Sequence, residues 1–228
     1  MSKKIGIIGG LGPMATAKFV EILNENITDY DSIEYLVIND PTTPDRTKYI
    51  LDHKNESPVP SILNMVDKLN KYKVDLIVMP CNTASYFYDQ ILKHTKINFI
   101  NIVEETVLYA KKNNIDKIGL LATRGSIKGG VYRHYCELYD IDYIIPNEEE
   151  QDVISSIIYD GIKAGQDYNA DELYNVSNSL IKKGAQKIIL GCTELSVIYQ
   201  DKKIVGDEFI DSMQVLGKRI VEKVNELE

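Results

Sequence analysis

The strongest constraint on the fold is a short apolar run that ends at a cysteine and occurs twice. The first copy, Val74 to Ser85, reads VDLIVMPCNTAS, and the second, Ala185 to Val197, reads AQKIILGCTELSV. A short apolar run bounded by a strand breaker is typical of a strand buried on both faces. Each cysteine therefore lies at the carboxyl end of a predicted strand, just before a predicted helix. Open α/β sheets bind their ligands at this edge.

A second pair of similar segments supports an internal duplication. Lys4 to Gly9 reads KIGIIG, and Lys117 to Ala122 reads KIGLLA. Cys81 follows Ile5 by 76 residues, and Cys192 follows Ile118 by 74. The alternation of apolar strands and amphipathic helices predicts an α/β fold of two similar subdomains, each a four-stranded parallel sheet flanked by helices. Two such units packed face to face place both cysteines across one cleft.

Hydrophobic periodicity gives the expected order of elements. Strands are predicted at Lys4–Ile8, Ile33–Ile38, Leu76–Met79, Phe99–Val103, Lys117–Ala122, Tyr143–Ile145, the run before Cys192, and Ile204–Val205. The main helices are predicted at Thr16–Ile27, Pro58–Tyr72, Ala84–His94, Glu104–Asn113, Asp152–Ala164, Ala170–Lys183 and Glu208–Leu227. The predicted subdomains are residues 1–103 and 104–212, and residues 213–228 form a last helix that packs back on the first.

Composition excludes several classes of function. The chain has 228 residues, 44% of them hydrophobic, and a formal charge of −8, with no basic stretch that nucleic acid would need. An anionic substrate would therefore require a local cationic site. No apolar run approaches the roughly 20 residues of a membrane span. The chain enters a predicted strand directly, without a cleavable apolar segment, so we expect a cytoplasmic protein without a membrane partner.

The cysteines and histidines favour neither a disulfide framework nor a metal site. Three cysteines lie far apart in the sequence, and three histidines show no paired spacing such as CxxC or HxxxH. Cys136 falls in the middle of a predicted helix, where a free cysteine is usually a small buried hydrophobic residue. Cys81 and Cys192 differ from it, because they occupy equivalent turns of the two repeats.

Two facing thiols suit two different chemistries. One is a disulfide switch. The other is proton transfer at both faces of one carbon, in which a thiolate removes the proton and a thiol on the opposite side returns one. The positive end of each helix dipole would favour a thiolate at the preceding cysteine.

The glycine-rich turn after the first strand also has two interpretations. The segment from Gly10 to Ala15 matches GxGxxA, a dinucleotide-binding pattern in which Asp40 would bind the ribose. Pro13 removes a backbone donor where the phosphate would lie. Alternatively, the amides of Gly10 and Gly12 form a nest for a carboxylate. We favour the carboxylate.

Two cations are candidates for holding an anionic substrate. Arg46 lies in the polar loop DPTTPDRTK, and a guanidinium suits bidentate capture of a carboxylate. The alternative for Arg46 is a solvated surface side chain. Lys163, in DGIKAG, ends a predicted helix, where its charge would also complement the helix dipole.

Polar residues next to the cysteines can bind substrate or cap the helices. Asn82, Thr83 and Thr193 follow the two cysteines directly and suit either role. Glu194 can pair with a substrate ammonium or complement a helix N-terminus.

Five motifs in this order resemble those of the aspartate/glutamate racemase family, and most closely its aspartate racemases, which need no pyridoxal phosphate. They are IGIIGGLGPMAT near the N-terminus, PDRT at Arg46, MPCNTA at Cys81, GIKAG at Lys163 and LGCTEL at Cys192. The resemblance runs from Lys4 to about Val224. Glutamate racemases are less similar, because they carry an acidic residue in the glycine loop and a histidine where Glu194 stands.

The resemblance implies a pseudo-twofold pair of subdomains with the site between them. It implies that Cys81 and Cys192 are the acid–base pair and that no cofactor or metal is needed. It also implies that Arg46 and Lys163 hold a substrate carboxylate. Members of the family are commonly homodimers. The further residues expected at the substrate are Gly10, Gly12, Met14, Asn82, Thr83, Thr123, Thr193 and Glu194. Thr123 and the additional candidate Ser126 lie in the loop ATRGSIKGG, which is less typical of the family.

The predicted function is cofactor-independent racemisation of an acidic amino acid, L-aspartate to D-aspartate, with glutamate as the nearest other substrate. Alternatives within the same class are a broad-specificity amino-acid racemase and a maleate-type cis–trans isomerase. An alternative of another class is a dinucleotide-binding or redox-regulated binding module.

Overall fold

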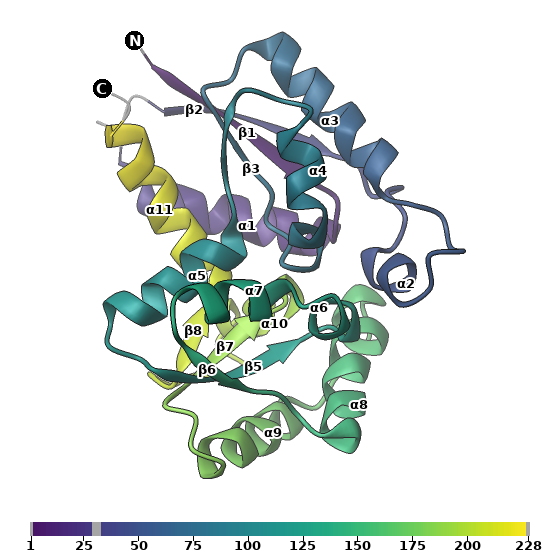
Figure 1. Ribbon diagram of the computed structural model, residues 1–228, viewed down its shortest axis with the longest axis vertical. Coiled ribbons are helices and arrows are strands. Elements are labelled where there is room, and N and C mark those ends of the chain that lie inside the picture. The colour runs from purple at the N-terminus through teal and green to yellow at the C-terminus, as the bar shows by residue number, and fades with distance from the viewer. Residues whose placement is uncertain (1, 29–32, 227–228) are drawn as a thin grey trace.

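The first half of the chain is a four-stranded parallel sheet covered by helices (Figure 1). The computed structural model describes residues 2–28 and 33–226. The strand order is β2-β1-β3-β4. Its strands are β1 (Lys3–Gly9), β2 (Ile33–Asn39), β3 (Leu76–Val78) and β4 (Asn98–Ile100). Its helices are α1 (Pro13–Asn26), α2 (Arg46–Leu51), α3 (Val59–Tyr72), the 3-10 helix η1 (Thr83–Phe87) and α4 (Tyr88–Leu92). The next helix, α5 (Ile102–Lys112), leads into the second half and packs against helices of that half.

The second half repeats this arrangement with the order β6-β5-β7-β8. Its strands are β5 (Lys117–Ala122), β6 (Asp142–Ile144), β7 (Lys187–Gly191) and β8 (Phe209–Asp211). Its helices are α6 (Arg124–Lys128), α7 (Val131–Leu138), α8 (Glu148–Ser156), the π-helix η2 (Ile157–Lys163), α9 (Ala170–Lys182), α10 (Thr193–Gln200) and α11 (Ser212–Glu226). The predicted fold of two four-stranded parallel sheets flanked by helices is therefore confirmed.

The duplication extends to the packing of single residues. Gly6 of β1 pairs with Ile77, and Gly119 of β5 pairs with Ile188. A Cβ on Gly6 would lie 2.7 Å from the side chain of Leu69, and one on Gly119 would lie 3.0 Å from Leu180. The glycine of each KIG motif thus makes room for a leucine of the helix that covers its sheet, Leu69 from α3 and Leu180 from α9.

The apolar stripe predicted on α3 is confirmed, because Ile62, Met65, Val66 and Leu69 are all buried. One hydrophobic core cluster combines residues of both sheets, including Ile5 of β1 and Ile118 of β5. α11 packs against α1 and α5, so the chain returns from the second sheet to the first (Figure 1). Within residues 2–28 and 33–226, no helix combines the length and apolar character required to cross a membrane.

The prediction for the end of the chain was wrong. The last strand is Phe209–Asp211 instead of Ile204–Val205, and the closing helix starts at Ser212 instead of Glu208. The three residues of β8 are fully covered and pair with β7, whereas Val205 is exposed. Three-residue strands carry too little periodicity to be distinguished from a helix start. The predicted end of that helix, Leu227, lies outside the described residues.

Other elements also differ from the prediction; the helix predicted at Asp152–Ala164, for example, begins at Glu148 and ends as the π-helix η2. The strand predicted at Phe99–Val103 ends at Ile100, because the Asn101 side chain accepts from the Val103 amide and begins α5. The helix predicted at Ala84–His94 begins instead as the 3-10 helix η1. The loop that carries Arg46 contains an additional helix, α2, which the Asp45 side chain caps by accepting from the Lys48 amide.

Candidate active site

Residues from both halves of the chain meet around one small cavity, called the inner cavity below. It lies where the turns after β1, β3, β5 and β7 converge with α2 and η2. Its lining is Leu11, Asp45, Arg46, Thr47, Cys81, Asn82, Thr83, Thr123, Tyr159, Lys163, Cys192, Thr193 and Glu194. Nine of the twelve residues expected at the site are among them; the other three, Gly10, Gly12 and Met14, lie elsewhere.

Cys81 and Cys192 both line the inner cavity and are nearly covered, with 5% and 4% of their surfaces exposed. All three cysteines are free, and Cys136 is buried in α7 away from this cavity. Burial raises the pKa of Cys136 to about 12, which fits an unreactive core residue. The fold therefore places Cys81 and Cys192 at the inner cavity and Cys136 in the core.

Cys192 lies at the N-cap of α10, where the helix dipole alone would favour the thiolate. Its surroundings have the opposite effect. Burial, followed by the negative charge of Glu194, raises the pKa of the Cys192 thiol well above its usual range. The Cys192 Sγ donates a hydrogen bond to Glu194 Oε2 at 2.9 Å. The expectation of a thiolate from helix position alone is therefore wrong for Cys192.

Cys81 follows Pro80 in a tight turn, in which its amide donates to the Met79 carbonyl at 2.7 Å. Its Sγ lies 3.9 Å from the carbonyl oxygen of Leu11, in the glycine-rich turn after β1. Cys81 thus contacts the N-terminal turn, whereas Cys192 contacts Glu194.

Asn82 is held by residues of the second half. Its Nδ2 donates to Ser212 Oγ at 3.0 Å, and its Oδ1 accepts from the Tyr132 hydroxyl at 2.7 Å. It does not cap η1 through its side chain, nor does Thr193 or Cys192 cap α10. The buried amide of Asn82 therefore connects the Cys81 turn to α7 and α11.

Three hydroxyl groups at or next to the inner cavity join the two halves. Thr83 Oγ1 lies 2.9 Å from Thr123 Oγ1, and Ser126 Oγ donates to Thr83 Oγ1 at 3.0 Å. Thr123 also accepts from the Ser126 amide, which makes it the N-cap of α6. Ser126 supports the two threonines from behind, since only the threonines line the cavity.

Arg46 is buried, with 6% of its surface exposed, so the solvated alternative is wrong. Its two terminal nitrogens already donate to backbone carbonyls. Nη1 donates to Thr43 at 3.3 Å and to Pro44 at 3.1 Å, and Nη2 donates to Leu11. Its Nε is buried without a hydrogen-bond partner among the described residues. Arg46 therefore ties the loop after β2 to the turn after β1, and its Nε, which has no partner among the described residues, is available to meet a substrate.

Arg46→Met should destabilise the fold as well as the site, because three buried carbonyls lose a charged donor. We expect a loss of about 3 kcal/mol in the free energy of unfolding, measured by urea denaturation. Lys48→Met, an exposed cation two residues further along α2, should leave stability unchanged. Equal stability of Arg46→Met and the native protein would contradict this structural role.

Lys163 ends the π-helix η2 and lies in a partly covered position. Its Nζ is 3.4 Å from Glu194 Oε1 and 5.2 Å from the centre of the Tyr159 ring. Burial opposes its charge, but the carboxylate of Glu194 and the buried cysteines leave the pKa of Lys163 raised overall. Lys163 is therefore a cation at physiological pH.

Gly10, Gly12 and Met14 line a neighbouring hollow, called the vestibule below, instead of the inner cavity. The Gly10 amide donates to Thr16 Oγ1 at 2.9 Å, so it is already used within the turn. Gly10 has φ +86, and a Cβ there would collide with the backbone of Asp40. The Asp40 carboxylate accepts from the amide and hydroxyl of Thr42. This turn is thus organised by its own contacts, which count against the favoured carboxylate nest at Gly10 as well as against the dinucleotide alternative.

Four lining residues were not predicted from the sequence: Leu11, Asp45, Thr47 and Tyr159. Tyr159 had the clearest signal, since it precedes Lys163 by four residues and so lies on the same face of a helix. The contacts of the other three arise from loops that meet only in the folded chain.

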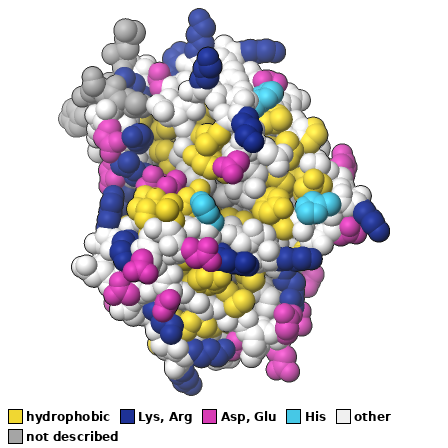
Figure 2. All heavy atoms as spheres, viewed as in Figure 1, with side chains coloured by type: hydrophobic (Ala, Val, Ile, Leu, Met, Phe, Trp, Pro, Cys, Tyr) yellow, Lys and Arg dark blue, Asp and Glu magenta, His cyan; other side chains and the backbone are white. Residues whose placement is uncertain are grey.

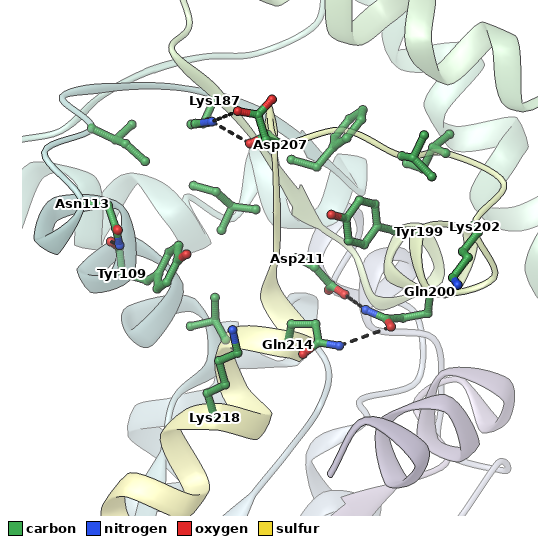
Figure 3. A pocket seen from close by; sticks show the side chains of 16 residues that line it. Tyr109, Asn113, Lys187, Tyr199, Gln200, Lys202, Asp207, Asp211, Gln214 and Lys218 are labelled. Atoms are coloured by element: carbon green, nitrogen blue, oxygen red, sulfur yellow. Dashed lines mark hydrogen bonds and ion pairs between the residues drawn. The ribbon is translucent and has the colours of Figure 1, made fainter. Parts of the chain in front are cut away.

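A hollow of about 720 Å³ lies elsewhere in the molecule (Figure 3), and neither Cys81 nor Cys192 lines it. It lies between α5, β8 and α11, where Gln200 donates to the buried Asp211 at 2.6 Å. Within the described ranges, no group of three or more His, Cys, Asp or Glu is placed to hold a metal ion. Figure 2 shows acidic and basic side chains interspersed on one face, without a basic surface of the kind that binds nucleic acid.

Comparison with known proteins gives matches over nearly the whole chain. The model of the Asp/Glu/Hydantoin racemase family matches residues 8–220. The structure of Picrophilus torridus aspartate racemase is 30% identical, with a TM-score of 0.83 over 98% of this chain and 95% of that one. A broad specificity amino-acid racemase of Bacillus subtilis is 26% identical over 95% of this chain and 96% of its own length. A glutamate racemase of Fusobacterium nucleatum subsp. nucleatum is 25% identical over 99% of this chain and 83% of its own length.

Proposed function

The chain belongs to the Asp/Glu/hydantoin racemase family, and from that premise we propose that it interconverts L- and D-aspartate. The observation that carries the proposal is the inner cavity, in which a cysteine from each sheet and the cation Lys163 meet. The mechanism needs a thiolate on one face of the α-carbon and a thiol on the other. The first removes the α-proton, and the second delivers a proton to the opposite face.

In this proposal Lys163 binds a substrate carboxylate, and Arg46 contributes through Nε. Thr83, Thr123 and Thr193 bind the amino-acid end, while Asn82 holds the Cys81 turn in place. We propose, from the resemblance to aspartate racemases, that the reaction needs no cofactor.

The direct test is racemisation measured by chiral chromatography, without added cofactor, on aspartate, glutamate and neutral amino acids. Turnover of aspartate above that of neutral amino acids supports the proposal. No racemisation of any amino acid would refute it and would favour the binding-module alternative.

The second candidate function is racemisation of a broad range of amino acids. The vestibule is the feature of the structure that favours it. This open hollow of about 260 Å³ includes the apolar side chains of Met14 and Ile162 next to Lys163. It would accommodate a side chain longer than that of aspartate. One methylene changes binding by only about 1–3 kcal/mol, so the panel of amino acids in the assay decides between the two.

We expect activity to persist into the alkaline range. If Cys81 supplies the thiolate, the active enzyme needs Cys192 as a thiol. Because a raised pKa keeps an acid protonated at higher pH, the alkaline fall in kcat/KM should lie above about pH 8.5, the ordinary value for a thiol. A pH profile of kcat/KM for aspartate measures this, and a fall centred at or below that value would contradict it.

We also propose that the enzyme is a homodimer, which rests on the family resemblance alone. Sedimentation velocity at assay concentrations should show a species of twice the chain mass of 25.8 kDa. A single monomeric species would refute this proposal and leave the chemistry untouched.

A further inference from the structure

The inner cavity is too small in this conformation to hold an amino acid. The volume open to the centre of a water-sized sphere is about 10 Å³. That is roughly the room needed by a single water molecule. Substrate binding therefore requires a side chain that now lines the cavity to move.

The side chains between the inner cavity and the vestibule are the candidates for this movement. Asp45, Arg46, Lys163 and Glu194 line both spaces. Asp45 caps α2, and Arg46 is held by three backbone carbonyls. Of these four side chains, those of Lys163 and Glu194 are thus held mainly by their ion pair and not by hydrogen bonds to the backbone.

Glu194 is only partly satisfied by hydrogen bonds. It is 3% exposed, and its Oε1 has no hydrogen-bond partner among the described residues, although Lys163 Nζ lies 3.4 Å away. A buried carboxylate oxygen that lacks hydrogen bonds is costly, so a move of Oε1 gives up only its ion pair, while Oε2 is held by the Cys192 thiol. Lys163 is the cation that the proposed function assigns to the substrate carboxylate.

Gly12 lines the vestibule, and Glu194 Oε1 already occupies the space that a side chain on Gly12 would fill. A Cβ on Gly12 would lie 2.5 Å from Glu194 Oε1, and its next neighbouring residue, Ala15, would be 3.6 Å away. Gly12 has an extended backbone, with φ −179, so a glycine is needed here for space and not for conformation.

We propose that Glu194 is a built-in competitor of the substrate. In the empty site its carboxylate occupies the place on Lys163 that a substrate carboxylate takes, and on binding it turns toward the vestibule. This inference rests on the proposed function for the role of Lys163. It predicts that removing the charge of Glu194 strengthens the binding of a dicarboxylate, because the ligand no longer displaces an internal anion.

Succinate is a suitable probe, since it carries two carboxylates and no ammonium group. Isothermal titration calorimetry should show succinate binding to Glu194→Gln about tenfold more tightly than to the native protein, because a neutral amide leaves the charge of Lys163 unpaired. Lys163→Met should bind succinate at least about tenfold more weakly. Glu149→Gln, which removes one exposed charge on α8, is the matched control and should bind like the native protein.

Unchanged or weaker succinate binding in Glu194→Gln would overturn the proposal. If in addition aspartate binding weakened while succinate binding did not change, Glu194 would instead be the partner of the substrate ammonium. The calorimetry does not depend on turnover. Failure of the native protein to racemise any amino acid would therefore refute the proposed function, while the comparison of succinate affinities would still test the competitor.

A double-mutant comparison tests the contact itself. Gly12→Ala should lower the Tm of the native protein, because its methyl group displaces the Glu194 carboxylate. The same change should have little effect on Tm in a Glu194→Ala background, where the obstructing oxygen is gone. Equal losses of Tm in the two backgrounds would show that Glu194 is not held at this place and would overturn the proposal.

Discussion

Cys81→Ser and Cys192→Ser should each lose racemisation of aspartate by at least about 10²–10⁴-fold. A serine hydroxyl is a far weaker acid than a thiol, so one face of the α-carbon loses its acid–base group. The remaining thiol can still remove a proton and return it to its own face. In heavy water each variant should therefore exchange the α-hydrogen of one enantiomer without inversion.

The two variants should differ in the enantiomer that they exchange. By family resemblance we assign Cys192 to the L-enantiomer and Cys81 to the D-enantiomer. Cys192→Ser should then exchange only D-aspartate, and Cys81→Ser only L-aspartate. Proton NMR of the α-position, combined with chiral analysis of the same samples, measures both events.

Cys136→Ala is the matched control, because this thiol is buried in α7 outside the inner cavity. It should keep activity near that of the native protein. Full racemase activity in either Cys81→Ser or Cys192→Ser would defeat the two-base mechanism. Reversed exchange preferences would overturn only the assignment of faces.

Lys163→Met should reduce kcat/KM for aspartate about 10- to 100-fold more than for a neutral amino acid such as alanine. The change removes a charge-assisted contact of about 1.5–3 kcal/mol to the substrate carboxylate. It also leaves the buried carboxylate of Glu194 without its ion pair, and this negative charge then repels an acidic substrate. Both effects act on aspartate more strongly than on alanine.

Steady-state kinetics on the two substrates measure this selectivity. Lys182→Met, an exposed lysine near the end of α9, removes the same charge far from the site and should change neither value. If Lys163→Met reduced activity on both substrates equally, Lys163 would be a structural residue, and its role as the carboxylate site would be refuted.

The sequence by itself determined seven of the eight strands and the position of both cysteines, but not the last strand, β8. The apolar runs before Cys81 and Cys192 are local signals, because a strand buried on both faces needs uninterrupted apolar residues. The repeated KIG motif reflects the same packing in both sheets, because Gly6 and Gly119 each leave room for a leucine from a covering helix. Parallel strands connected by helices then bring the carboxyl ends together, which is why residues of both halves line one cavity.

The tertiary structure decided what each polar side chain does there. Arg46 Nη2 donates to the carbonyl of Leu11, 35 residues away, and Asn82 donates to Ser212, 130 residues away. Neither partner is visible in a local pattern. The pKa of Cys192 is another example: its position at a helix N-terminus favoured a thiolate, but burial and the adjacent Glu194 raise it. Hydrogen-bond partners and desolvation depend on which distant residues cover a group, and those are known only once the chain is folded.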